Sequence, residues 1–278
     1  MTDLYYDVHG SGPVLLIIPG GAGHPMGLGP LTEALADRFT VVVHDPLGLA
    51  HGRLGSPVDD QRVEDWSDRA RRVLDSVLAD GETAYVLGTS AGAVVALDLL
   101  ARHPERLRHV VAHEPPCVGV LPDGHRHRAM FREVADTYRA AGLRAAAARM
   151  TAGLTDQPAP AAEAPRPPLV GQPLTREEEL GNPMALSLAH VLVPFTSYDP
   201  DLTALASAPL TLAAGSDSRG QLLYRTAEFT ARRTGAAFAE FPGGHLGVAQ
   251  HPDAFAEHLV GVVGFGERGH DRSPTASA

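Results

Sequence analysis

Short runs of apolar residues alternate with helical patterns along most of the chain, and this alternation does most to restrict the possible folds. The runs are almost continuously apolar, which is typical of strands buried on both faces of a parallel sheet. The helices between them supply the crossovers that parallel strands need and cover both faces. The expected strands lie at 14–20, 39–48, 83–88, 107–116, 208–215 and 236–245. The sequence therefore predicts an α/β fold with a doubly wound, mostly parallel sheet.

Residues 118–207 interrupt this alternation. Helical patterns at 126–150 and 174–195 flank a connector at 155–173 that is rich in Pro and Ala. We interpret this segment as a helical cap inserted between two strands of one core, and we expect a few of its apolar side chains to line a substrate pocket. The predicted organisation is a core of 1–117 and 208–266, a cap of 118–207 and a disordered polar tail of 267–278.

Charge and composition exclude several classes of protein. The formal net charge is −10 and no Arg cluster alternates with aromatic residues, which argues against nucleic acid as a partner. The 23 basic residues are all Arg, so Schiff-base chemistry on a lysine is impossible. No apolar run approaches the roughly 20 residues of a membrane span, and the first residues lack a signal-peptide pattern. We expect a cytoplasmic protein that acts on a small molecule, and its oligomeric state stays open.

The sequence G-T-S-A-G at 88–92 places Ser90 between a strand and a helix. The G-x-S-x-G pattern alone has little weight in a glycine-rich chain, but here a buried strand precedes it and a helical pattern follows it. A sharp strand-to-helix turn needs small neighbours, and it holds a serine hydroxyl clear of the sheet. The pattern therefore predicts that Ser90 is a nucleophile for acyl transfer.

Two further regions would complete such a site. The Ala91 N–H at the helix start would be one oxyanion donor. The loop P-G-G-A-G at 19–23 would supply another, with Gly21 as the first choice and Ala22 as the second. His245 follows the last strand on a Gly-Gly turn, where a general base is expected, because nucleophile, acid and histidine then follow in that order along the chain.

The chain has 14 histidines, so position has to select among them. His24, His44 and His113 also lie near strand ends or in the facing loop. We interpret these three as structural or substrate-lining residues.

The segments L-L-I-I-P-G-G-A-G, V-V-V-H-D-P-L-G-L-A-H-G-R, G-T-S-A-G-A and F-P-G-G-H-L-G together resemble the α/β-hydrolase family, in particular its small actinobacterial serine hydrolases. The resemblance covers residues 4–265 apart from the cap. It implies that Ser90 is the nucleophile, that His245 is the general base and then acid, and that Gly21 and Ala91 form the oxyanion hole. It implies no cofactor and no metal. Pro19 departs from the pattern, because many relatives carry His before this Gly.

Two carboxylates compete for the role of the triad acid. Asp217 follows the fifth expected strand, in the loop where most relatives keep the acid, but it lies one residue early. Glu114 ends the fourth expected strand, where haloalkane dehalogenases and some other branches place it. We favour Glu114 and keep Asp217 as the alternative. Either residue could instead cap backbone N–H groups in its loop.

Alternative functions are less well supported. A dinucleotide-binding loop would need a glycine where Met26 stands, and Pro25 interrupts the turn. His125 and His127 are two residues apart, a spacing that does not converge on one metal ion from a helix.

The best prediction is a serine hydrolase that cleaves an ester, lactone, thioester or amide of a small, largely apolar molecule through an acyl-enzyme. The alternative is a non-hydrolytic relative, such as a cyclase, isomerase or epimerase of a biosynthetic pathway.

Overall fold

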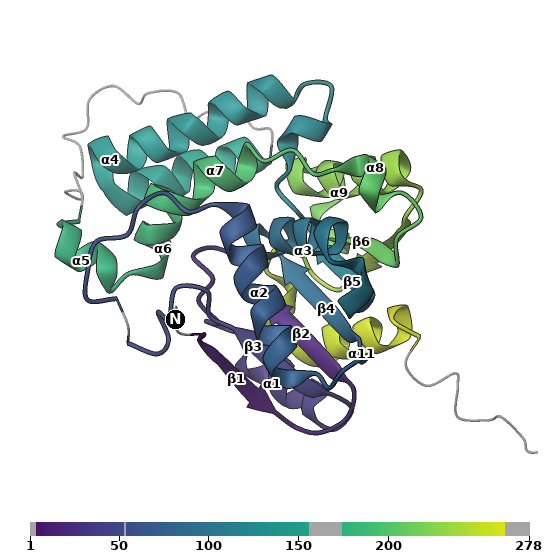
Figure 1. Ribbon diagram of the computed structural model, residues 1–278. Coiled ribbons are helices and arrows are strands. Elements are labelled where there is room, and N and C mark those ends of the chain that lie inside the picture. The colour runs from purple at the N-terminus through teal and green to yellow at the C-terminus, as the bar shows by residue number, and fades with distance from the viewer. Residues whose placement is uncertain (1–3, 53, 156–173, 265–278) are drawn as a thin grey trace, which may run out of the picture.

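The computed structural model describes residues 4–52, 54–155 and 174–264, and its centre is a seven-stranded sheet (Figure 1). The strand order is β1-β3-β2-β4-β5-β6-β7, and every neighbouring pair is parallel except β1 with β3. The predicted doubly wound, mostly parallel sheet is confirmed. The strands are β1 (Tyr6–His9), β2 (Val14–Ile18), β3 (Thr40–His44), β4 (Ala84–Thr89), β5 (Leu107–His113), β6 (Leu210–Gly215) and β7 (Ala237–Phe241).

The antiparallel strand β1 is absent from the sequence prediction. Its burial pattern is one half-buried residue followed by three exposed ones, so it lacks the apolar run that marks the inner strands. An edge strand hydrogen-bonds on one side only and can remain polar. Its pairing with β3 therefore left no hydrophobic signal in the sequence.

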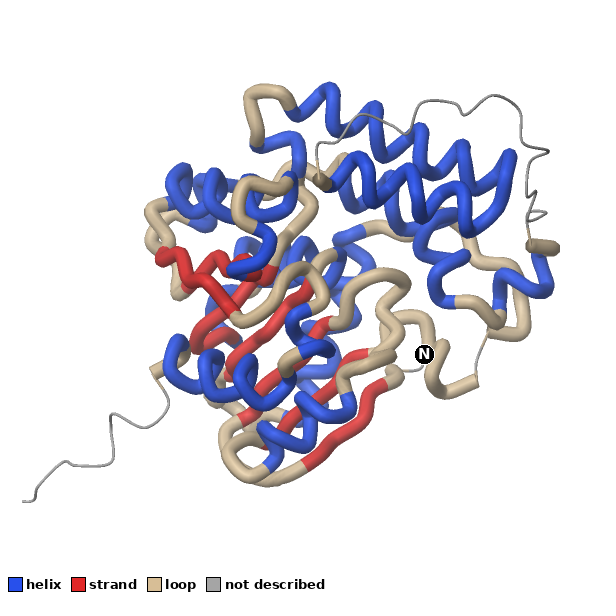
Figure 2. The backbone as a smooth tube through the Cα atoms, turned by 180° about the vertical axis from the view of Figure 1, so that it is seen from behind, coloured by secondary structure: helices blue, strands red, loops and turns tan. Residues whose placement is uncertain are grey.

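Helices cover both faces of the sheet, as Figures 1 and 2 show from opposite sides. Helices α2, α3 and α9 pack on one face around the apolar side chains of β4, β5 and β6, while α1 and α11 pack on the other. None of the helices in the described residues is long and apolar enough to cross a bilayer. The α-helices are α1 (Gly29–Ala36), α2 (Val63–Val77), α3 (Ala91–Arg102), α4 (Gly124–Leu154), α5 (Arg176–Leu180), α6 (Pro183–Leu186), α7 (Leu192–Thr196), α8 (Leu202–Leu205), α9 (Leu222–Thr234), α10 (Gly247–Gln250) and α11 (Pro252–Val262).

The chain between β5 and β6 forms a helical layer beside the carboxyl ends of the strands (Figure 1). Helix α4 is broken at Gly142, whose φ of 78° is not helical, and a π-helix at Ser187–Val191 joins α6 to α7. This layer, the cap, has its own small apolar cluster. The predicted connector at 155–173, apart from Thr155, and the predicted tail at 267–278 lie outside the described residues.

Contacts near the end of α7 join the cap to helices of the core. The Phe195 ring of α7 packs edge-on against Trp66 of α2, with 4.8 Å between ring centroids. The Tyr198 hydroxyl donates a hydrogen bond of 2.6 Å to Asp98 of α3, a buried carboxylate. These contacts fix the end of the cap that follows the π-helix.

Candidate active site

Ser90 occupies a strained turn between β4 and α3. Its φ of 52° and ψ of −120° are rare for a residue with a side chain. A Cβ at Gly88 would lie 2.4 Å from the Gly92 carbonyl oxygen, and a Cβ at Gly92 would lie 2.0 Å from the Ile18 carbonyl oxygen, so both positions require glycine. The Ser90 N–H donates a 2.9 Å hydrogen bond to the His113 carbonyl oxygen. The end of β5 therefore holds the turn in place.

Glu114 and His245 form a close pair beside this serine. Glu114 Oε2 lies 2.7 Å from His245 Nδ1, and Glu114 Oε1 accepts a 3.0 Å hydrogen bond from the Gly215 N–H. The Glu114 side chain is 1% exposed and that of His245 is 31% exposed. Burial opposes ionisation of Glu114, but its bond to His245 prevails and lowers the pKa of the carboxyl. The carboxylate thus stays ionised in a buried position.

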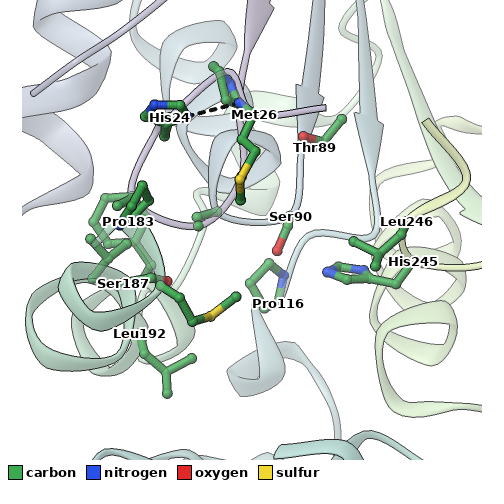
Figure 3. A pocket seen from close by; sticks show the side chains of 18 of the residues that line it. His24, Met26, Thr89, Ser90, Pro116, Pro183, Ser187, Leu192, His245 and Leu246 are labelled. Carbon is green, nitrogen blue, oxygen red and sulfur yellow. Dashed lines mark hydrogen bonds between the residues drawn. The ribbon is translucent and has the colours of Figure 1, made fainter. Parts of the chain in front are cut away.

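The opposite edge of the His245 ring faces the Ser90 turn. Figure 3 shows the Ser90 hydroxyl and the His245 ring pointing toward one another. Because Nδ1 faces the Glu114 carboxylate, Nε2 is the nitrogen left for a proton of Ser90. Glu114 itself has a φ of 49°, so two of the three residues have unusual backbone angles.

Asp217 lies outside this arrangement. Its N–H donates a 2.9 Å hydrogen bond to the Gly243 carbonyl oxygen, and its carboxylate accepts one of 3.4 Å from the Ser216 hydroxyl. In the described residues, the carboxylate that contacts His245 is that of Glu114. The structure therefore brings Ser90, His245 and Glu114 together and leaves Asp217 in its loop.

The loop after β2 packs directly against the Ser90 turn. A Cβ at Gly20 would lie 3.0 Å from the Ser90 Cβ, and the next residue, Gly21, has a φ of 58°. Ala91 is the first residue of α3, so its N–H has no acceptor within the helix. Gly21, Ala22 and Ala91 line the same cavity as Ser90. Backbone N–H groups of this loop and of the helix start are thus available near the serine.

A cavity of about 330 Å³ lies between these loops and the cap. Its lining includes apolar side chains of α4, α6, the π-helix and α7, and among the described residues it contains no Arg, Asp or Glu. Three large apolar side chains of the lining are exposed, namely Met26 at 68%, Met184 at 54% and Leu246 at 60%. The cavity therefore suits a neutral, mainly apolar molecule. The cap contributes Phe131, Met150, Leu154, Pro183, Met184, Ser187, Val191, Leu192, Phe195 and Thr196.

Of the three histidines that we interpreted as structural or substrate-lining, two are buried and one lines the cavity. His44 and His113 are buried, and burial lowers the pKa of His44 to about 3 and that of His113 to about 4. His24 lines the cavity, and its Nδ1 accepts a 3.0 Å hydrogen bond from the Met26 N–H. Across the described residues, no group of His, Cys, Asp and Glu side chains is placed to hold a metal ion.

Ser187 is a polar residue of the cavity that the sequence did not indicate. It lies at the start of the π-helix and faces the loop after β2. The predicted helix at 174–195 was treated as regular, and the sequence around Ser187 carries no signal that this serine lines a cavity.

A model of the Alpha/beta hydrolase family matches residues 9–258. The chain belongs to this family. An uncharacterized hydrolase of Bacillus subtilis (strain 168), YraK, is a relative 30% identical over 266 residues, which cover 93% of this chain and 91% of YraK. Zearalenone hydrolase of Bionectria ochroleuca is 24% identical over 259 residues, or 92% of each chain. Both relatives of this α/β hydrolase are named as hydrolases.

Solved structures agree with the family. MGS-M2, an alpha/beta hydrolase enzyme from a Medee basin deep-sea metagenome library, has a TM-score of 0.70 against this chain. The two sequences are 13% identical and the match covers 97% of both chains. At this identity the similarity concerns the fold, which is that of the α/β hydrolases.

Proposed function

We propose that the protein is a serine hydrolase that cleaves an ester, lactone, thioester or amide bond of a small, largely apolar molecule. Ser90 is the nucleophile, His245 the general base and acid, and Glu114 the triad acid. The observation that carries this proposal is the 2.7 Å contact between His245 Nδ1 and Glu114, with the Ser90 hydroxyl facing the other edge of the ring (Figure 3). Such a chain of three groups activates a serine that is otherwise a weak nucleophile.

The first half of the reaction forms an acyl-enzyme. His245 Nε2 takes the Ser90 proton as Oγ attacks the carbonyl carbon, and the carbonyl oxygen becomes an oxyanion near the N–H groups of Ala91 and Gly21. The bond to the leaving group then breaks, and His245 returns the proton to that group. The ionised Glu114 stabilises the imidazolium between the two proton transfers.

The second half hydrolyses the acyl-enzyme. A water molecule gives a proton to His245 Nε2 and attacks the same carbonyl carbon, which forms a second oxyanion at the Gly21 and Ala91 N–H groups. The bond to Ser90 Oγ breaks, and Oγ recovers its proton from His245. The acid product leaves and the three side chains return to their starting states.

The relatives and the cavity support this assignment. YraK and zearalenone hydrolase are both named hydrolases, and the described lining of the cavity beside Ser90 is largely apolar and has no Arg, Asp or Glu. A neutral acyl substrate could leave water and enter such a cavity with little desolvation cost.

Active-site labelling and ester turnover test the proposal. A fluorophosphonate probe should attach to Ser90, as mapped by peptide mass spectrometry, and His245→Ala should slow the attachment strongly because the hydroxyl loses its base. The wild type should also hydrolyse p-nitrophenyl esters of medium chain length. Labelling without hydrolysis of any ester would favour a non-hydrolytic acyl transfer, whereas a Ser90 that does not react would refute the proposal.

A further inference from the structure

The Ser187 hydroxyl is a polar group on the cap side of an apolar cavity. A Cβ added to Gly21 would lie 3.8 Å from Ser187 Oγ, so the cap serine stands opposite the loop that contacts the Ser90 turn. Within the described part of the chain, the hydroxyl has no hydrogen-bond partner. A serine in a helix commonly donates to the carbonyl oxygen four residues earlier, and Ser187 does not.

The backbone of Ser187 belongs to both α6 and the π-helix Ser187–Val191. Its N–H donates to the Pro183 and Met184 carbonyl oxygens at the end of α6, and its own carbonyl oxygen accepts from the Leu192 N–H across the π turn, while its hydroxyl stays free among the described residues. Thr196, another cavity residue on the cap, provides the contrast. It lies in regular helix α7 and donates its hydroxyl to the Leu192 carbonyl oxygen at 2.7 Å. Of these two cap hydroxyls, that of Ser187 is available to a ligand.

The position of Ser187 indicates which part of a substrate its hydroxyl would contact. In the proposed reaction His245 returns a proton to the leaving group, so the leaving group lies on the His245 side of Ser90. Figure 3 shows Ser187 on the other side of Ser90 from His245. The acyl group, which stays attached to Ser90 in the intermediate, therefore extends toward Ser187.

We propose that Ser187 is a specificity residue that donates a hydrogen bond to an oxygen within the acyl group of the substrate. The substrate class is a neutral ester or lactone whose acyl chain carries a ketone, hydroxyl or ether oxygen. A carboxylate is disfavoured because no Arg of the described residues lines the cavity to neutralise it. This inference rests on the proposed function for the direction in which the acyl group extends.

The test compares p-nitrophenyl octanoate with derivatives in which one ketone moves carbon by carbon along the acyl chain beyond the third carbon. Binding of the intact esters is measured by calorimetry in the Ser90→Ala background, so the readout does not depend on turnover. At least one ketone ester should bind about three- to tenfold more tightly than the octanoate, the factor typical of one net hydrogen bond. Ser187→Ala should abolish this difference and leave binding of the plain octanoate unchanged.

Ser197→Ala is the matched control, because Ser197 is also a cap serine, at the end of α7, and does not line the cavity. It should preserve the preference for the ketone ester. In the enzyme with Ser90 intact, Ser187→Ala should raise KM for that ester, whereas Ser197→Ala should leave this KM unchanged. The inference is overturned if no ketone position is preferred or if the preference survives Ser187→Ala. Failure of the proposed function is seen separately, as a Ser90 that does not react with fluorophosphonate.

Discussion

The two walls of the cavity are built in opposite ways. On the core side, Ser90 and Glu114 follow adjacent parallel strands, and tight backbone contacts and buried hydrogen bonds hold them in strained conformations. On the cap side, the lining comes from helix segments interrupted at Gly142 and by the π-helix, and its side chains are largely apolar. A sheet edge fixes atoms to within a fraction of an ångström, as bond cleavage requires, whereas short helix segments can be repacked to accept another substrate. Changes to the core should therefore affect turnover, and changes to the cap should affect selection.

The largest expected effect is that of Ser90→Ala. Removal of the proposed nucleophile should lower kcat on p-nitrophenyl esters by on the order of 10⁶, the loss found when a triad hydrolase loses its serine. The fold should persist, because the methyl group of alanine occupies less space than the hydroxymethyl group, and circular dichroism and thermal unfolding can check this. Retention of most of the activity in a folded variant would refute the role of the core wall.

A smaller effect distinguishes the two carboxylates. Glu114→Gln keeps the shape of the side chain but removes the charge that stabilises the His245 imidazolium, so kcat should fall by on the order of 10⁴. Asp217→Asn, the matched carboxylate-to-amide change in a loop beside the site, should leave kcat within about twofold of wild type. Steady-state kinetics on one ester suffice for both variants. The reverse pattern would move the triad acid to the loop after β6.

Acid should destabilise the core through its buried histidines. Burial lowers the pKa of His113 to about 4, so between pH 6.5 and 4 the unfolded chain binds more protons and the free energy of unfolding falls as the pH falls. This one group should account for about 3 kcal/mol across that window. His113→Phe, which fits against Phe241 and Phe255, should flatten the pH dependence seen in denaturant unfolding.

His125→Phe serves as the control for this measurement, because His125 is an exposed residue of the cap. Its pH dependence should match that of the wild type. Equal flattening by both variants would mean that the acid sensitivity is not specific to the core.

The smallest expected effect lies at the rim of the cap. Met184→Ala removes apolar surface from the cavity mouth, so KM for p-nitrophenyl octanoate should rise about two- to fivefold. The kcat for p-nitrophenyl acetate should stay the same, because the short acyl group does not reach the rim. Val8→Ala, which shortens another exposed apolar side chain on the distant strand β1, should change neither value. A change in kcat for the acetate would contradict the assignment of turnover to the core side of the cavity and of substrate selection to the cap side.

The sequence predicted the core wall well because its signals are local. An apolar strand precedes Ser90, small residues surround it, and a Gly-Gly turn precedes His245. Each of these features can be recognised from a few consecutive residues. The choice between Glu114 and Asp217 depended on which side chain reaches the histidine, a contact between residues far apart in the chain. The position of Asp217, one residue early in its loop, favoured Glu114, but the sequence could not show that contact.

The cap was predicted only in outline. The helical pattern at 126–150 matches α4, but nothing marked Gly142 as a break rather than an exposed helical residue. The pattern at 174–195 was treated as continuous, yet Pro183 starts a new helix and the turn after it widens. Helix spacing alone cannot distinguish an α turn from a π turn. The sequence therefore could not predict that Ser187 lines the cavity.

The bond between Glu114 and His245 also affects the loop after β6. The carboxylate follows β5, so among the described residues the loop at 216–220 gives no side chain to the histidine. The Gly215 N–H just before the loop donates to Glu114, and the Asp217 N–H donates to the Gly243 carbonyl oxygen. A Cβ at Gly220 would meet nothing within 4 Å, so the far end of the loop faces open space. We therefore expect an inserted epitope, a fluorophore or new termini from circular permutation to be tolerated at Gly220. A reporter attached there would lie in the loop that follows β6, the strand next to the one that carries Glu114.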